Sequence, residues 1–388
     1  MREITPDPPG RFVDGDRLDR VRSRMSELDI DGFLAFSPAN SYYLTGCYAG
    51  MYSRPVIGLV TEEQSFFIGP RLELRKADRT AWTDRVVVYE DSDDPFDVAA
   101  RVVKECTLRR IGIDEGFARP SWVAELSKRT EPSFEDVTDS FLSLRAIKTE
   151  WEIEMVKRAR DLSRAGIEAF LDAVEPGAAE IEILEEIQQA YYQVYLDEYA
   201  QYDIGTANEL GQYGFANALT GGHALEPHSL ASARRIEDDH SIVGIALPSI
   251  QGYVCEQERT VLMGNIASEI TEAMQNLVEA RNEAMDMVGP GVGTDEIDAA
   301  TTDRLREAGY EDNLIHRTGH GEGITIHEGP ALNARTPGEL QPGMVISIEP
   351  GLYFEDHDLA LRHSDTLVVT DTGADRLTHA DDGVLTID

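Results

Sequence analysis

Lysine and cysteine are scarce in this chain. Only five of the 388 residues are lysines, so thirty of its 35 basic residues are arginines. The three cysteines, Cys47, Cys106 and Cys255, lie far apart and form no CxxC pair, which argues against a disulfide framework and favours buried free thiols. No apolar run reaches the length of a membrane span, and the opening residues MREITPDPPG show no signal-peptide pattern. We therefore expect a soluble, cytoplasmic protein that does not bind a membrane.

Positive charge is also scarce. Lys and Arg number 35 against 72 Asp and Glu, which gives a net charge of −37, and the acids are spread along the whole chain. Such a charge repels itself in dilute solution and is screened by salt, so a high-salt cytoplasm is the favoured interpretation. An acidic surface tuned to a cationic partner is the alternative. No basic stripe is present to neutralise phosphates, so we expect no nucleic-acid partner.

Histidine is absent from the first part of the chain, since none of the nine histidines precedes position 223. This part alternates helical spacing, as in DRLDRVRSRMSELD, with short apolar runs such as GFLAF, PVIGLV, SFFIGP and RVVVYE. That alternation predicts an α/β domain with a mostly parallel or mixed sheet. Acid–base or metal chemistry is expected in the second part, where all the histidines lie.

The pattern changes near residue 145, and we predict two domains, residues 1–144 and 145–388. Thr149 followed by Glu152 has the spacing of a capping box and predicts the start of a long amphipathic helix. An internal repeat follows. VEPGAAEIEI (174–183) matches VGPGVGTDEI (288–297) at five of ten positions, each copy at a turn between two predicted helices. Chance is the alternative, because Pro-Gly often ends helices, but the shared setting favours two similar α/β halves.

Polar residues concentrate in strand-like stretches of the second part. In GYVCEQERT, strand alternation puts Glu256 and Glu258 on one face, and SIEPG places Glu349 at the end of an apolar run. A buried pair of carboxylates needs a proton or a cation, whereas a solvated edge strand needs neither, and both interpretations stay open. HRTGHGEGITIHE holds three histidines. The spacing of His320 and His327 does not fit a helical two-histidine zinc motif.

Taken together, TGHGEGITIHEGP, GMVISIEPGLYF and LRHSDTLVV, after EPH and GYVCEQERT, resemble the pita-bread hydrolases of the creatinase, prolidase and Xaa-Pro aminopeptidase branch. RLDRVRSRMSELDIDGFLAFSPANSYYLTG resembles the N-terminal domain of the same branch, so the resemblance covers nearly the whole chain. It implies an α/β N-terminal domain and an α+β pita-bread catalytic domain with two pseudo-symmetric halves around a central cleft. These motifs are specific for the fold and much less specific for the reaction.

The peptidases of this family bind two metal ions through two Asp, one His and two Glu. The resemblance places Ile245 and Glu256 at the Asp positions, His320 at the His position, and Glu349 and Ser364 at the Glu positions. An isoleucine offers no lone pair, and a serine hydroxyl is a poor ligand for a divalent ion. We therefore predict no dinuclear centre and no required cofactor. At most, Glu256, His320 and Glu349 could hold one Mn, Zn or Co ion.

Creatinase shows that the family also hydrolyses without metal. The resemblance gives the position of its acid–base histidine to His228, and the positions of its two active-site glutamates to Glu258 and Glu349. It also implies a homodimer in which Tyr52 and Arg54 bind the substrate in the partner's site, the arginine holding a carboxylate. No counterpart of the second substrate-binding arginine of creatinase occurs near Pro330, which argues against creatine itself as the substrate.

We therefore predict an enzyme that cleaves a C–N bond in a small carboxylate-bearing amino-acid derivative or dipeptide-like substrate. His228 would transfer protons, Glu258 and Glu349 would hold a cationic part of the substrate, and His320 and His327 would complete the pocket. One alternative is an Xaa-Pro dipeptidase or aminopeptidase with a single metal ion. The other is an inactive binding or scaffold protein, against which the retained, costly buried charges argue.

Overall fold

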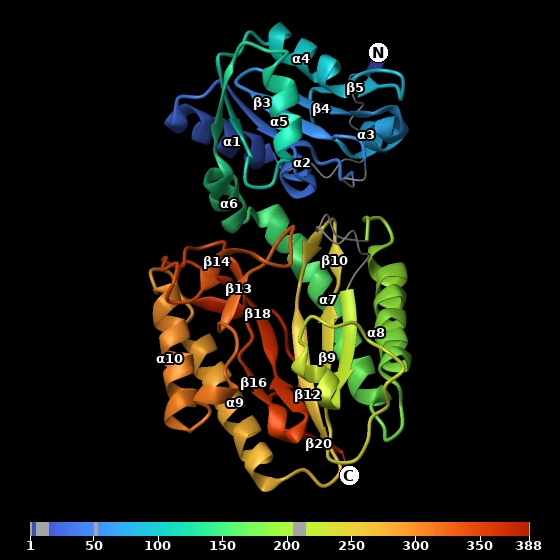
Figure 1. The fold of residues 1–388 in the computed structure, drawn as a ribbon, viewed down its shortest axis with the longest axis vertical. Coiled ribbons are helices and arrows are strands. Elements are labelled where there is room, and N and C mark those ends of the chain that lie inside the picture. The colour runs from blue at the N-terminus through green and yellow to red at the C-terminus, as the bar shows by residue number, and fades with distance from the viewer. Residues whose placement is uncertain (1, 5–14, 50–52, 205–214, 388) are drawn as a thin grey trace. The chain divides into compact units, whose positions relative to one another are not determined.

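The computed structural model describes residues 2–4, 15–49, 53–204 and 215–387. The chain forms two compact units (Figure 1). The first ends at Arg145, one residue beyond the predicted end of the first domain, and the second begins at Ala146 and holds most of the remaining chain.

The first unit is built on a seven-stranded mixed sheet of order β1-β5-β4-β3-β2-β6-β7. The pairs β4/β5, β2/β6 and β6/β7 are parallel, and the pairs β1/β5, β3/β4 and β2/β3 are antiparallel. The strands are β1 (Arg2–Ile4), β2 (Gly32–Ala35), β3 (Ile57–Thr61), β4 (Ser65–Pro70), β5 (Arg85–Tyr89), β6 (Arg110–Ile113) and β7 (Ser133–Asp136). The helices are α1 (Gly15–Leu28), α2 (Pro38–Thr45), η1 (Arg71–Glu73), α3 (Leu74–Thr80), α4 (Pro95–Glu105), α5 (Pro120–Ser127) and α6 (Thr138–Ala146).

Local signals explain where these elements begin. The side chain of Asp94 accepts the N–H of Phe96 and caps α4, whose first residue is a proline. Buried Asp114, directly after β6, accepts the N–H groups of Phe36 and Ser37 at 2.8 and 2.9 Å and so fixes the turn from β2 into α2. Apolar faces of the strands and of α4 and α5 form one core. The predicted α/β domain with a mixed sheet is therefore observed.

The second unit holds a nine-stranded sheet. Seven strands follow the order β14-β13-β15-β18-β12-β9-β8, while β19 pairs with β18 and β20 with β12. The strands of the unit are β8 (Phe215–Thr220), β9 (Ser241–Leu247), β10 (Ser249–Ile250), β11 (Tyr253–Val254), β12 (Gln257–Met263), β13 (Gly319–Gly321), β14 (Glu328–Leu332), β15 (Val345–Ile348), β16 (Gly351–Phe354), β17 (Leu359–Arg362), β18 (Ser364–Val369), β19 (Ala374–Arg376) and β20 (Leu385–Ile387). β10/β11 and β16/β17 form separate hairpins.

Two helix pairs accompany this sheet. Figure 1 shows α7 and α8 on one side of the unit and α9 and α10 on the other. The helices are α7 (Glu150–Ala173), α8 (Glu180–Val194), the π-helix η2 (Tyr195–Tyr199), η3 (Gly221–Leu225), α9 (Ser268–Met287), α10 (Thr294–Glu307), η4 (Glu311–Asn313) and η5 (Glu355–His357). The predicted capping box begins α7: Thr149 accepts the N–H of Glu152, and Glu152 accepts the N–H of Thr149.

The internal repeat has a structural counterpart in the turns between the paired helices. Gly177 and Gly291 occupy equivalent places, with φ of 84° and 83°. Each donates its N–H to a backbone carbonyl of a later segment. Gly177 donates to Ile236 at 2.9 Å, and Gly291 donates to Leu340 at 2.8 Å. Two residues on, Ala179 and Gly293 each form an isolated bridge with that same segment. The two halves of the unit therefore share backbone geometry as well as sequence.

The described helices include none that is long and apolar enough to cross a membrane. Cys47 and Cys255 are buried, as predicted, whereas Cys106 is only partly buried, which corrects the prediction for that thiol. Burial raises the pKa of the Cys255 thiol well above its usual value. A buried thiol of this kind behaves as a small apolar side chain.

Candidate active site

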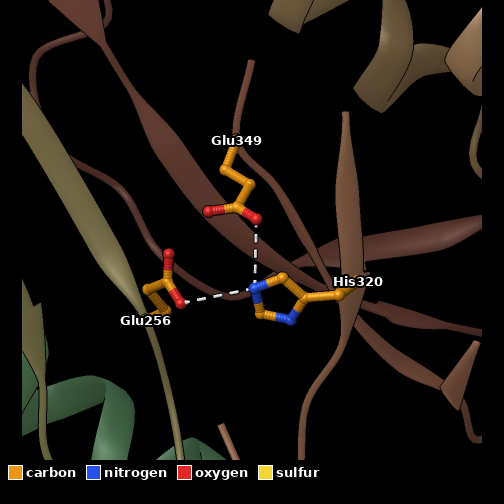
Figure 2. Close-up of side chains that lie close together, drawn as sticks. All are labelled: Glu256, His320 and Glu349. Atoms are coloured by element: carbon orange, nitrogen blue, oxygen red, sulfur yellow. Dashed lines mark ion pairs between the residues drawn. The ribbon is translucent and has the colours of Figure 1, made fainter. Parts of the chain in front are cut away.

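Three predicted site residues meet at the ends of strands in the middle of the nine-stranded sheet. Glu256 directly precedes β12, His320 lies in β13, and Glu349 directly follows β15. His320 Nε2 lies 3.1 Å from Glu349 Oε1 and 3.8 Å from Glu256 Oε2. Figure 2 shows both carboxyl groups directed at this one ring nitrogen. The other ring nitrogen, Nδ1, donates to the carbonyl oxygen of Gly321 at 3.1 Å, which fixes the ring.

Two further glutamates lie in the same region. We call Glu256, Glu258, Glu322 and Glu349 the glutamate cluster, because the charges of other members raise the pKa of Glu256, Glu258 and Glu322. All are buried except Glu349, which keeps a small exposed fraction. Glu322 Oε2 accepts the hydroxyl of Thr366 at 2.9 Å. Four carboxyl groups so close together cannot all be charged unless cations compensate them. Without enough cations, some of them must hold a proton.

The pKa values divide the glutamate cluster. Burial would raise the pKa of Glu349, but the charge and contact of His320 outweigh it and lower the value to about 2. Burial acts in the opposite direction on His320 and would lower its pKa, but Glu349 raises that pKa. The two residues therefore form an imidazolium–carboxylate pair. Burial and the charge of Glu349 raise the pKa of Glu256 well above its usual value. A carboxyl group whose pKa is raised therefore stands beside an imidazole–carboxylate pair, an arrangement suited to proton transfer.

Arg362, at the end of β17, supplies a fixed positive charge. Its Nε lies 2.6 Å from Glu258 Oε2, and its Nη1 donates to the hydroxyl of Tyr353 at 3.5 Å. The same hydroxyl lies 3.0 Å from His316 Nε2. Burial raises the pKa of Glu258 to about 7 although Arg362 opposes the rise. The carboxylate predicted to meet a cationic substrate is therefore already paired with a cation of the protein.

The two residues that the resemblance places at altered ligand positions flank Glu258. In the sheet register, Glu258 stands opposite Ile245 of β9 on one side and Ser364 of β18 on the other. The Ile245 side chain belongs to an apolar cluster with Leu247 and Tyr353. The buried Ser364 hydroxyl makes no hydrogen bond within the described residues.

These surroundings decide which metal centre the residues fit. Ile245 and Ser364, which the resemblance places at two of the five ligand positions, offer no carboxylate, so these residues do not supply the full donor set of a dinuclear centre. The ligand atoms of Glu256, His320 and Glu349 lie within 4.8 Å of one another, a donor set that one divalent ion could use.

A row of histidines leads from this group toward the surface. The rings of His320 and His327 lie 4.3 Å apart, and those of His327 and His228 lie 6.2 Å apart. Partial burial and the positive charge of His320 lower the pKa of His327 to about 4, so this ring is neutral near pH 7. His228 is exposed and, within the described residues, makes no hydrogen bond to Glu258 or Glu349. The structure thus brings the three predicted histidines together in one row, in the order His320, His327 and His228.

The remaining predicted residues belong to the first unit. Arg54 makes two contacts with Asp91, from Nε at 2.7 Å and from Nη2 at 2.9 Å, and this pair is exposed. Asp91 raises the pKa of the guanidinium further. Tyr52 lies outside the described residues.

Four residues of the site were not assigned from the sequence: Glu322, Arg362, Tyr353 and His316. Glu322 could have been found, because it stands two residues after His320 in a strand-like run and so shares its face. Arg362 and Tyr353 stand in the motifs LRHSDTLVV and GMVISIEPGLYF, but nothing in the sequence showed their contacts. Their partners are far away in sequence and meet them only through the pairing of β16 with β17 beside β12.

Comparisons with known proteins agree with this arrangement. Residues 154–371, more than half of the chain, match the model of metallopeptidase family M24, and residues 17–147 match the creatinase/prolidase N-terminal domain. The chain belongs to metallopeptidase family M24. The predicted branch and the predicted fold, an α/β domain followed by a pita-bread domain, are therefore confirmed, and the chain is a hydrolase of C–N bonds.

Individual relatives span nearly the whole chain. A putative dipeptidase, YkvY, of Bacillus subtilis is 26% identical over 367 residues, which cover 93% of this chain and 97% of the relative. The solved Xaa-Pro dipeptidase from Bacillus anthracis is 25% identical, with a TM-score of 0.82 over 96% of this chain and 99% of its own. The prolidase from Thermococcus sibiricus is 26% identical, with a TM-score of 0.84 over 97% of this chain and 100% of its own.

Proposed function

We propose that this chain hydrolyses a C–N bond in a small carboxylate-bearing amino-acid derivative or dipeptide-like substrate without a dinuclear metal centre. The observation that carries the proposal is the position of Glu258, which pairs with Arg362 and stands between Ile245 and Ser364, where the resemblance places metal ligands of the family's peptidases. A guanidinium bound to a carboxylate at 2.6 Å supplies fixed positive charge without a second ion. The proposed reaction requires no cofactor.

The electrostatics of the site favour a substrate with a cationic part. The glutamate cluster contributes four carboxyl groups, whereas the described residues in contact with it supply two cations, His320 and Arg362. A positively charged group of the substrate beside the glutamate cluster would offset this excess of acid. His320 and His327 complete the wall of the pocket, and neutral His327 can accept a hydrogen bond from the substrate.

His228 is the proposed acid–base. It is exposed at the outer end of the histidine row, where water and a leaving nitrogen have access. An imidazole can take a proton from water and return one to the leaving nitrogen within one turnover.

The test replaces His228 and follows turnover on a panel of N-substituted amino acids and Xaa-Pro dipeptides. His228→Ala should lose on the order of a hundred- to ten-thousand-fold in kcat with little change in binding. His357→Ala is the matched control, because that histidine pairs with Glu269 at 3.4 Å in a different part of the unit. Full activity of His228→Ala would remove His228 from the mechanism.

A second candidate function is an Xaa-Pro dipeptidase or aminopeptidase with one divalent ion. The observation in its favour is the ligand geometry of Glu256, His320 and Glu349. In this case Mn, Zn or Co would polarise the scissile carbonyl and supply a bound water. Loss of activity on chelation, with rescue by one of these ions, distinguishes this candidate from the metal-free reaction.

The proposal extends to a homodimer in a salt-rich cytoplasm. Tyr52 and Arg54 would bind the substrate carboxylate in the partner's site, which requires Arg54 to exchange Asp91 for the substrate. Mixing His228→Ala chains with Arg54→Ala chains should then restore part of the activity, because one of the two mixed sites keeps both residues. Heterodimers without any recovery would place Arg54 outside the partner's site. No nucleic acid or membrane partner is proposed.

A further inference from the structure

A second group of reactive side chains lies in the segment that leads to His228. His223, in η3, is held between a carboxylate and a hydroxyl. Its Nδ1 lies 2.8 and 2.9 Å from the two carboxyl oxygens of Glu180, and its Nε2 lies 2.9 Å from the hydroxyl oxygen of Ser229. Glu180 and His223 are buried, and Ser229 is partly exposed. None of these three residues has a role in the proposed C–N hydrolysis.

The contacts of Glu180 fix the direction in which this group can move a proton. Besides His223, its carboxyl oxygens accept the N–H of Thr220 at 2.9 Å, the N–H of Ser232 at 2.8 Å and the hydroxyl of Ser232 at 2.7 Å. A carboxyl that receives only donors is an acceptor toward the imidazole as well, so Nδ1 carries the hydrogen. In the neutral ring Nε2 then has a free lone pair, directed at the Ser229 hydroxyl.

The surroundings of Ser229 leave room for a reacting group. The next residue, Leu230, is 64% exposed, and within the described part of the chain its N–H makes no hydrogen bond. The N–H of the residue after a nucleophile is one of the donors that stabilise a developing oxyanion. One neighbour opposes the reaction: Glu226 Oε2 lies 3.0 Å from the Ser229 hydroxyl and competes with His223 for its proton.

We propose that Ser229, His223 and Glu180 form a nucleophilic acyl-transfer site for small carboxylic esters, which shares no residue with the proposed C–N hydrolase site. The Ser229 oxygen attacks the ester carbonyl carbon while its proton passes to His223 Nε2. The bond to the alcohol oxygen breaks, and His223 returns the proton to the leaving alcohol. Water then attacks the acyl-serine, gives its proton to His223, and releases the carboxylic acid as the serine regains its hydrogen. Glu180 acts as a positioning residue, which orients the imidazole.

The probe is a fluorophosphonate, which reacts only with an activated serine. The Ser229 O–P bond forms, the P–F bond breaks, and the serine proton passes to His223 as fluoride leaves. Full-length protein in molar potassium chloride should gain one adduct, which mass spectrometry of peptides assigns to Ser229. Ser229→Ala should show none. His223→Asn keeps a donor for Glu180 but lacks the base, and should react slower by on the order of a hundred- to ten-thousand-fold. Glu226→Ala should react faster, because the competing acceptor is gone.

Matched variants separate this role from a structural one. Ser232→Ala should keep the adduct, because that hydroxyl contacts Glu180 and the N–H of Arg234 and not the imidazole. Melting curves establish that each variant is folded. A folded wild type without an adduct, an adduct on another serine, or equal reaction rates for wild type and His223→Asn would overturn the proposal. In each of these cases the contacts of His223 only hold the segment in place.

Discussion

Arg362 Nε lies 2.6 Å from Glu258 Oε2, and both side chains are buried. Glu258 stands in the sheet between Ile245 and Ser364, the two residues that the resemblance places at ligand positions of the family's peptidases. A protein cation thus lies against the carboxyl group between these two positions. The metal-free proposal depends on this relationship.

The first prediction concerns the stability of the pair. Arg362→Met leaves the carboxylate of Glu258 buried without its partner, and should lower the free energy of unfolding by about 3–5 kcal/mol. Adding Glu258→Gln should restore more than half of that loss, because no charge then remains unpaired. Urea denaturation in molar salt measures both. Arg54→Met, which breaks the exposed pair with Asp91, is the control and should change stability little. Equal losses in the single and double variants would show that the two residues are not coupled.

The second prediction concerns pH. Burial, together with the charges of Arg259 and Arg281, lowers the pKa of His363 well below its usual value. The unfolded chain therefore binds a proton below about pH 6.5 that the folded chain does not, so stability falls as the pH falls. Relative to His363→Gln, the wild type should lose about 1.4 kcal/mol per pH unit between pH 6.5 and 5. A stability difference between the two proteins that stays constant from pH 7.5 to 5 would exclude His363 as the cause.

The third prediction concerns salt. With a net charge of −37, the folded chain repels itself more strongly as screening weakens. The melting temperature should fall steadily as potassium chloride is lowered from molar to millimolar concentration. In the control experiment, sucrose of equal osmolarity replaces the potassium chloride, which tests for excluded-solvent effects. A flat melting temperature across the range would remove the argument for a high-salt cytoplasm.

The fourth prediction concerns metal binding. Calorimetric titration with manganese should find at most one ion per wild-type chain, held by Glu256, His320 and Glu349. The double variant Ile245→Asp, Ser364→Glu supplies the two absent carboxylates and should bind one ion more. Ile245→Val is the matched control and should bind as the wild type does. Two tightly bound ions per wild-type chain would show that the dinuclear centre forms without these ligands.

Much of the fold follows from local sequence. The capping box at Thr149 and Glu152, the alternating runs of the first unit and the repeated Pro-Gly turns at Gly177 and Gly291 are all set by residues near one another in the chain. Short-range steric and hydrogen-bonding rules fix such features. The predictions drawn from them agree with the structure.

The site could be predicted only in part. Glu256, His320 and Glu349 were found because each stands in a strand-like motif that resembles the family's. The Glu258–Arg362 pair could not be foreseen, because its partners are 104 residues apart and meet only when β17 packs beside β12. The same limit applied to His223, whose contacts with Glu180 depend on how the segment after β8 folds back over α8.

The central claim is tested most directly by the initial rate of the wild-type enzyme, on its best substrate, after exhaustive treatment with a chelator in molar salt. The account predicts a rate within about twofold of the untreated enzyme, because the proposed catalytic groups are His228, Glu258 and Glu349 and no proposed step needs a metal ion. Complete loss of the rate on chelation, with rescue by manganese or zinc, would contradict it and establish Glu256, His320 and Glu349 as metal ligands.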